Sequence, residues 1–154
     1  SNNVIKYIKS FSFKSLTSLL FLHLNNNKLN KIEFNTFVGL INLEEIYMQF
    51  NQLTYLESNI FSHLLKLKIL DLSNNLIKSL NSNCFSNLSS LEYLNLENNR
   101  IKYLGNQIFS NLHKLNTINL ANNKIKYLDA QFSNLKSLKN IYLSKNSLSM
   151  LNRL

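Results

Sequence analysis

The chain has 154 residues, of which 45% are hydrophobic and 16% charged, so it carries enough apolar material for one folded domain and too much for a disordered tail. No apolar run approaches the ~18 residues that a membrane-spanning helix needs, and the single cysteine, Cys84, excludes an internal disulfide framework. The formal net charge of +9 suggests an anionic partner, an interpretation that depends on where the basic side chains lie.

A period of 24 residues, marked by asparagine, runs along the whole chain. When this asparagine is numbered position 9 of each repeat, apolar residues recur at positions 1, 4, 6, 11, 14, 19 and 22. The marker residues are Asn3, Asn27, Asn51, Asn75, Asn99, Asn123 and, after 23 residues, Asn146. Such a period predicts a solenoid, in which no repeat buries its apolar face alone and neighbouring repeats complete one core.

In chain order, each repeat contributes one short predicted strand, because positions 4 and 6 are apolar and position 5 between them faces outward. These segments are 22–24, 46–48, 70–72, 94–96, 118–120 and 141–143. Parallel stacking of the strands gives a sheet with a spacing of about 4.8 Å.

Two further rows follow from the period. The asparagines from Asn27 to Asn146 are predicted to form a ladder that satisfies backbone groups where the chain leaves each strand. The phenylalanines from Phe13 to Phe132 are predicted to stack on the other side of the core. Cys84 precedes one of these rings, and we expect it to be a buried, inert, small apolar residue.

The pattern LxxLxLxxNxLxxLxxxxFxxL resembles the leucine-rich repeat over the whole chain. The length of 24 residues with phenylalanine at position 19 is similar to the subclass common in extracellular animal proteins such as Toll-like receptors and Slit. The resemblance implies an α/β-type solenoid with a curved parallel β-sheet on its concave side and mostly irregular loops on its convex side. Residues 1–154 are expected to be one array of about seven repeats, incomplete at both ends and without caps. We therefore expect a slice of a longer protein, whose ends meet neighbouring repeats or other chains.

The resemblance implies that ligands lie most often on the concave sheet. Its outward positions carry aromatic and acidic residues in the first four strands, as protein-binding hot spots do. The candidates are Phe21, His23, Glu45, Tyr47, Phe50, Ile69, Asp71, Tyr93 and Glu97. They favour a non-enzymatic protein-binding module of the receptor, adhesion or immune-recognition type, presenting these side chains to a protein partner. The alternative that these are ordinary exposed strand residues stays open.

A second candidate surface lies where the strands pass into the loops, at positions 10, 12 and 13. This basic ridge consists of Lys78, Arg100, Lys102, Tyr103, Lys124, Lys126 and Tyr127. It suggests an adhesion or matrix module that binds an anionic glycan, with nucleic acid ranked lower. Long lysine side chains also simply keep a solenoid soluble, and that reading stays open as well. A third hypothesis is a structural scaffold that assembles end to end.

Catalysis finds no support in the sequence. No histidine or cysteine has the spacing of a metal site, no glycine-rich phosphate loop occurs, and we expect neither cofactor nor metal. Asn87-Leu88-Ser89 is a glycosylation sequon, so Asn87 is a candidate modification site. The repeat subclass favours an extracellular or cell-surface location, while an intracellular one stays open.

Overall fold

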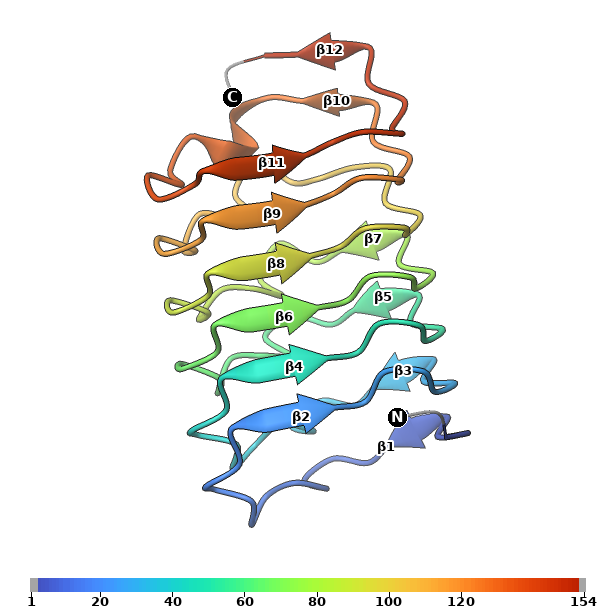
Figure 1. The fold of residues 1–154 in the computed structure, drawn as a ribbon, viewed down its shortest axis with the longest axis vertical. Coiled ribbons are helices and arrows are strands. Elements are labelled where there is room, and N and C mark those ends of the chain that lie inside the picture. The colour runs from blue at the N-terminus through green and yellow to red at the C-terminus, as the bar shows by residue number, and fades with distance from the viewer. Residues whose placement is uncertain (1–2, 153–154) are drawn as a thin grey trace.

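Each repeat of the sequence forms one turn of a solenoid in the computed structural model, which describes residues 3–152 (Figure 1). One strand from each of six turns joins a parallel sheet with the order β11-β9-β8-β6-β4-β2. The strands are β2 (Phe21–His23), β4 (Glu45–Tyr47), β6 (Ile69–Asp71), β8 (Tyr93–Asn95), β9 (Thr117–Asn119) and β11 (Asn140–Tyr142). Each begins and ends one residue before the predicted segment, because the paired backbone is centred on the buried residue at position 4.

Neighbouring strands pair in a register of one full repeat, so that equivalent residues lie opposite each other. Leu22 is opposite Ile46, and Ile46 is opposite Leu70. In β2, β4 and β6 the middle residue is buried in the core, while the two flanking residues are exposed or half-buried on the outer surface of the sheet. The sheet therefore has one apolar face and one face available to solvent.

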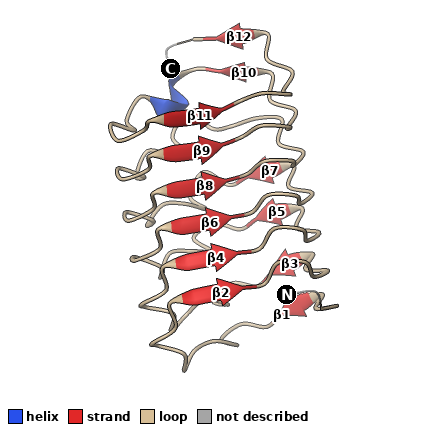
Figure 2. Ribbon diagram, in the orientation of Figure 1, coloured by secondary structure: helices blue, strands red, loops and turns tan. Residues whose placement is uncertain are grey.

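Two-residue strands on the far side of the turns form a second set that the sequence pattern did not predict. They are β1 (Tyr7–Ile8), β3 (Lys31–Ile32), β5 (Tyr55–Leu56), β7 (Ser79–Leu80), β10 (Tyr127–Leu128) and β12 (Met150–Leu151). They pair as β1-β3, β5-β7 and β10-β12. Within residues 3–152 the helical content is the 3-10 turn η1 (Ala130–Phe132), and the rest is irregular (Figure 2). The predicted solenoid with a parallel sheet and irregular loops is confirmed.

The asparagine ladder is also confirmed. At its centre, the Asn75 side-chain oxygen accepts a hydrogen bond from the backbone N–H of Leu53 at 3.0 Å. The Asn75 amide nitrogen donates to the carbonyls of Met48 at 3.0 Å and of Leu72 at 3.1 Å. Each such side chain thus joins its own turn to the preceding one. The same three bonds recur at Asn51, Asn99, Asn123 and Asn146.

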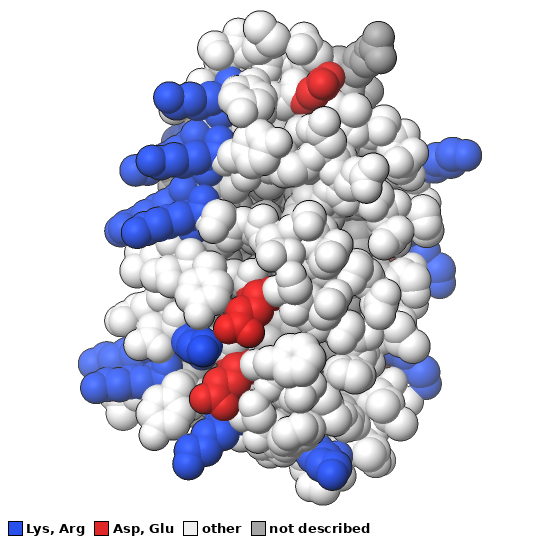
Figure 3. All heavy atoms as spheres, turned by 180° about the vertical axis from the view of Figure 1, so that it is seen from behind, with Lys and Arg blue, Asp and Glu red and all other residues white. Residues whose placement is uncertain are grey.

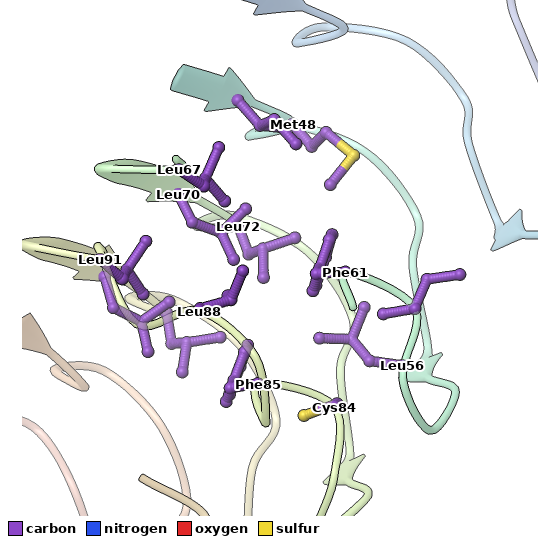
Figure 4. Packing of buried hydrophobic residues seen from close by; sticks show 14 of the residues in the cluster. Met48, Leu56, Phe61, Leu67, Leu70, Leu72, Cys84, Phe85, Leu88 and Leu91 are labelled. Carbon is purple, nitrogen blue, oxygen red and sulfur yellow. The ribbon is translucent and has the colours of Figure 1, made fainter. Parts of the chain in front are cut away.

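The core fills the space between the sheet and the loops (Figure 4). The predicted phenylalanine stack runs from Phe13 to Phe132, with each ring 5.5–6.5 Å from the next. Cys84 lies beside the ring of Phe85 and is 1% exposed, as the sequence predicted. Burial raises the pKa of the Cys84 thiol to about 12, so the thiol stays protonated and unreactive at neutral pH.

A left-handed residue follows each strand of the sheet and turns the chain out of it. The φ angles at this position lie between 52° and 58°. The residues are Asn26, Phe50, Asn74, Asn98, Asn122 and Lys145. Asparagine tolerates this conformation better than other residues with a side chain, which explains why it recurs at position 8.

Candidate functional site

The structure brings the nine predicted binding residues together on the solvent-facing side of the sheet, over β2, β4, β6 and β8 and the turns after them. We call these nine residues the sheet-face patch. One row of the register runs Phe21, Glu45, Ile69, Tyr93, and the next runs His23, Tyr47, Asp71 and then Asn95. Phe21, His23 and Phe50 are exposed, whereas the other six members are half-buried among their neighbours.

Tyr47 is held by two other members of the patch. Its ring stacks on that of His23, with 4.8 Å between the centroids and 7° between the planes. Its hydroxyl donates a hydrogen bond to Glu45 Oε2 at 2.7 Å. This hydrogen bond, followed by burial and by the charges of Glu45 and Asp71, raises the pKa of Tyr47 to about 12. The ring is thus fixed before any partner arrives, and its hydroxyl stays protonated at neutral pH.

The carboxylates of the patch are fixed in a similar way. Asp71 Oδ1 accepts a hydrogen bond from the backbone N–H of Ser73 at 2.9 Å. Glu97 Oε2 accepts one from the side-chain amide of Asn119 at 3.0 Å. Tyr93 lies near both acids, and its pKa is raised by burial first and then by the charges of Asp71 and Glu97. The surface around Tyr93 is therefore negative and well ordered.

The charge of this part of the sheet is negative although the chain is basic. Five carboxylates lie on or beside β4, β6 and β8, against one lysine, Lys68. Lys68 is itself paired with Glu44, with 2.8 Å between Nζ and Oε2, and this hydrogen bond raises the pKa of Lys68. The carboxylates are Glu44, Glu45, Asp71, Glu92 and Glu97.

Phe50 departs from the rule that governs its position. Its φ is 58° and its side chain is 53% exposed. Asparagines at the equivalent position form an outer row in which Asn122 donates from its amide to Asn98 Oδ1 at 3.0 Å, and Asn98 donates to Asn74 Oδ1. Phe50 cannot take part in this row, and a bulky residue in left-handed backbone costs roughly 1–2 kcal/mol. The run of asparagines at position 8 is the sequence signal that marks Phe50 as an exception.

Gln49 lies next to Phe50 in the chain and was not among the residues that the sequence singled out. Its Oε1 atom is buried and has no hydrogen-bond partner among the described residues. An unsatisfied buried acceptor costs about 1–3 kcal/mol. A strained aromatic residue and an unsatisfied acceptor therefore occupy adjacent positions in the turn that follows β4. No pattern in the sequence identifies Gln49, because whether its Oε1 atom finds a hydrogen-bond donor depends on the conformations of the side chains around it.

The basic ridge forms on a different surface, along the side edge where the chain leaves the sheet. Its five cations are exposed, as are Tyr103 at 54% and Tyr127 at 49%. The two tyrosine rings meet edge to face, with 5.8 Å between their centroids. Figure 3, which views the molecule from behind, shows lysine and arginine side chains gathered along one side edge. The ridge residues occupy positions 10, 12 and 13 of successive turns, whereas the sheet-face patch occupies the strands of the sheet and the turns directly after them.

The candidate glycosylation site, metal-binding residues and membrane-spanning helices were also sought in the structure. Asn87 is exposed on the loop side, where its amide nitrogen donates to the carbonyl of Ser62 at 3.4 Å. Across residues 3–152, no three residues of the His, Cys, Asp or Glu type are grouped so that they could hold a metal ion. No helix in the same range is both long and apolar enough to cross a membrane.

Comparison with known proteins agrees with this geometry. The family model described as leucine rich repeat matches residues 1–53, 41–101 and 94–148. A solved TLR13–ssRNA13 complex contains a chain that is 32% identical, with a TM-score of 0.90 over 96% of this chain and 21% of that one. A chain of the LRIM1/APL1C complex is 26% identical, with a TM-score of 0.90 over 97% of this chain and 28% of that one.

The present chain therefore spans between a fifth and a third of the length of these two solved chains. No curated protein matches it significantly. The repeat matches together cover residues 1–148, and the solenoid architecture is shared with the solved chains. The chain belongs to the leucine-rich repeat family.

Proposed function

We propose that this chain is a non-enzymatic recognition module whose sheet-face patch binds a protein partner. The observation that carries the proposal is Phe50, which is kept exposed and strained at a position where asparagine would be more stable. The turn requires left-handed backbone here but does not require phenylalanine, and residues held in strained backbone are concentrated at functional sites. Exposed aromatic residues are enriched at the centres of protein interfaces.

The rigidity of the patch supports the same function. Tyr47 is held by His23 on one side and by Glu45 on the other. A side chain that is already ordered loses little conformational entropy when a partner binds, so its contacts contribute more to affinity. The patch thus offers an exposed and strained anchor, Phe50, together with the ring of Tyr47, which is fixed in advance.

The charge of the patch indicates the chemistry of the partner. Five carboxylates on or beside three strands favour lysine or arginine side chains around an apolar group. The same carboxylates repel phosphate groups, so this face is unsuited to nucleic acid. Of the two solved relatives, LRIM1 is found in a complex with APL1C, and TLR13 in a complex with ssRNA. The repeat family accommodates both kinds of ligand, and charge favours protein on this face.

We also place the protein outside the cell or at its surface, as a receptor or an adhesion module. The similarity of the repeats to those of Toll-like receptors and the exposed sequon asparagine Asn87 support this location. Glycosylation of Asn87 would leave the sheet-face patch uncovered, since Asn87 belongs to the loop side of its turn.

The test uses a phage-displayed library of random peptides, selected on the immobilised wild-type chain. Enriched peptides are then measured against Phe50→Asn and against a matched control, Phe34→Asn. Phe34 is 54% exposed and lies outside the six-stranded sheet. We expect enriched peptides to carry basic residues near an aromatic or aliphatic one. Phe50→Asn should weaken their binding by at least about tenfold, as loss of a hot-spot residue does, while Phe34→Asn leaves it unchanged.

Stability measurements make this test decisive. Phe50→Asn should be more stable than the wild type by about 1 kcal/mol, because it removes the left-handed phenylalanine. Loss of binding then cannot be attributed to loss of fold. Peptides that bind both variants as tightly as the wild type would contradict the proposal.

A further inference from the structure

The basic ridge is a surface that the proposed function does not use. Its cations flank buried isoleucines of successive turns, with Arg100 and Lys102 on either side of Ile101, and Lys124 and Lys126 on either side of Ile125. Both isoleucines are fully buried, so the charged residues beside them are forced outward. The alternation of the backbone thus places two parallel rows of cations along the solenoid.

Backbone hydrogen bonds fix the spacing of these rows. Arg100 N–H donates to the carbonyl of Ile77 at 2.9 Å, and Lys124 N–H donates to that of Ile101 at 2.8 Å. The ladder asparagines hold the isoleucines themselves, since Asn123 accepts from the N–H of Ile101 at 3.0 Å. Cations on neighbouring turns therefore repeat about every 5 Å. That spacing suits a flexible chain that carries one negative charge on each unit.

The cations of the ridge are not neutralised within the protein. Among the described residues, the ion pairs are Lys31 with Glu57 and Lys68 with Glu44, and neither includes a ridge residue. The acids closest to the ridge in sequence are Glu97 and Asp129. The Glu97 carboxylate is instead engaged by Asn119. The ridge thus keeps its positive charge for an external partner.

The two tyrosines of the ridge indicate which class of polyanion would bind there. Tyr103 and Tyr127 follow Lys102 and Lys126 directly, and about half of each side chain is exposed. Neither hydroxyl makes a hydrogen bond to the described residues, and the two rings contact each other edge to face. A sulfated glycan needs cations but no stacking surface, whereas unpaired bases stack on aromatic rings beside a basic track.

We infer that the basic ridge binds single-stranded nucleic acid, with phosphates along the cation rows and bases against Tyr103 and Tyr127. This site is independent of the sheet-face patch and lies on another surface. The ranking of nucleic acid below anionic glycans, drawn from the sequence, is thereby reversed for the ridge. The reason for the reversal is the exposure and free hydroxyls of the two tyrosine rings.

The probe is a fluorescein-labelled oligouridylate of about 12 nucleotides, a length within the known range of single-strand sites. Binding is followed by fluorescence anisotropy between about 50 mM and 200 mM KCl. With five phosphate contacts, the affinity should fall about 100-fold over this range, a logarithmic slope near −3.5. The double variant K124Q/K126Q should reduce the slope by about 1.4, because two contacts are lost.

Matched variants show whether RNA binds at the ridge or is attracted to the basic protein as a whole. K114Q/K136Q removes the same charge from exposed lysines outside the ridge and should change the affinity less than about twofold. Tyr103→Ala and Tyr127→Ala should each weaken binding between about 5- and 150-fold if they stack on bases. Circular dichroism melts of all variants verify that they are folded.

Three results would overturn the inference. One is the absence of RNA binding at the lowest salt concentration. Another is an equal loss of affinity in the two double lysine variants, which would indicate non-specific attraction. The third is tight binding of a heparin oligosaccharide of similar charge that the tyrosine variants do not affect, while RNA binds weakly. Failure of this test leaves the sheet-face proposal untouched, since Phe50→Asn retains the whole ridge.

Discussion

Gly39 shows how closely adjacent turns approach each other. Its φ is +94°, and a Cβ atom placed there would lie 2.1 Å from the carbonyl oxygen of Lys14 in the preceding turn. Two independent constraints, backbone conformation and space, therefore require glycine. Gly105 has neither constraint, because a Cβ atom there would meet nothing within 4 Å. The two glycines of the chain are thus a natural pair for comparison.

We predict that Gly39→Ala lowers the free energy of unfolding by more than about 2 kcal/mol, through the clash with Lys14 and the strained φ. Gly105→Ala should be neutral or stabilising by up to about 1 kcal/mol, since alanine restricts the unfolded chain. Urea unfolding followed by circular dichroism measures both. Equal effects of the two substitutions would show that the close approach at Gly39 is relaxed in solution.

At the scale of single residues, the sequence predicts position well and contacts poorly. The period assigns Tyr47 to the outer face of its strand, where the structure finds it. Its stacking on His23 and its bond to Glu45 depend on side-chain torsions that no repeat pattern encodes. The strain at Phe50 lies between these two cases. It can be predicted only by comparing repeats, because asparagine at the equivalent positions indicates a left-handed turn.

At the scale of the structural element, two neighbouring asparagines have different roles. Asn75 is 4% exposed and joins two turns through the ladder. Asn74 precedes it in left-handed backbone, where its amide contacts are part-buried or exposed. The first residue satisfies buried backbone groups, and the second makes a turn possible.

We predict that Asn75→Ala destabilises the protein by about 2 kcal/mol or more. The buried N–H of Leu53 is left without a partner, at about 1–3 kcal/mol, and the carbonyls of Met48 and Leu72 each lose one of their two side-chain donors. Asn74→Ala should cost only about 1 kcal/mol, the preference of asparagine for left-handed backbone. Chemical denaturation of both variants measures the difference. A reversed order would mean that water or a shifted backbone replaces the ladder bonds.

The second set of short strands shows a limit of the repeat pattern. The letters IKYL occur at both 101–104 and 125–128, yet a strand forms only in the second case, at β10. Strand formation depends on both neighbouring turns as well as on local sequence. Gly105, a residue type depleted from strands, follows the first segment. Identical sequence thus gives different local structure in different turns.

At the scale of the whole molecule, stability is a sum over neighbouring turns. Strand pairing, the asparagine ladder and the phenylalanine stack each link a turn to the ones beside it. Proteins of this architecture behave as one-dimensional arrays, whose cooperativity depends on every interface between repeats. If an interface between two turns near the middle of the solenoid is weakened, the turns on either side of it should unfold less cooperatively with each other.

We predict that Phe85→Ala, at the centre of the stack, costs about 3–5 kcal/mol through the cavity that it leaves. It should also lower the apparent m-value, because turns on either side of the cavity would no longer unfold together. The measurement is urea unfolding followed by two probes, tyrosine fluorescence and circular dichroism. Phe13→Ala, at the partly buried end of the stack, is the control and should leave the m-value unchanged.

The distribution of charge is also a property of the whole molecule. A net charge of +9 for the chain suggests a uniformly basic surface. Assigning residues to repeat positions already separates an acidic sheet from a basic edge. In the structure the acids lie on or beside the strands of the sheet, and the ridge residues lie beyond the ends of those strands. The sequence does not predict whether the ridge cations form ion pairs, because that depends on the distances to the surrounding acids. In the structure neither ion pair among the described residues includes a ridge residue.

The asparagine ladder has a mechanical consequence. Because the bonds of Asn75 join only its own turn to the preceding one, tension applied to the two ends reaches the turns one after another. Each turn that detaches would release 24 residues, or about 80 Å of extended chain. Under force the protein would lengthen in nearly equal steps, so that a bound partner on one set of turns could remain held while others unravel.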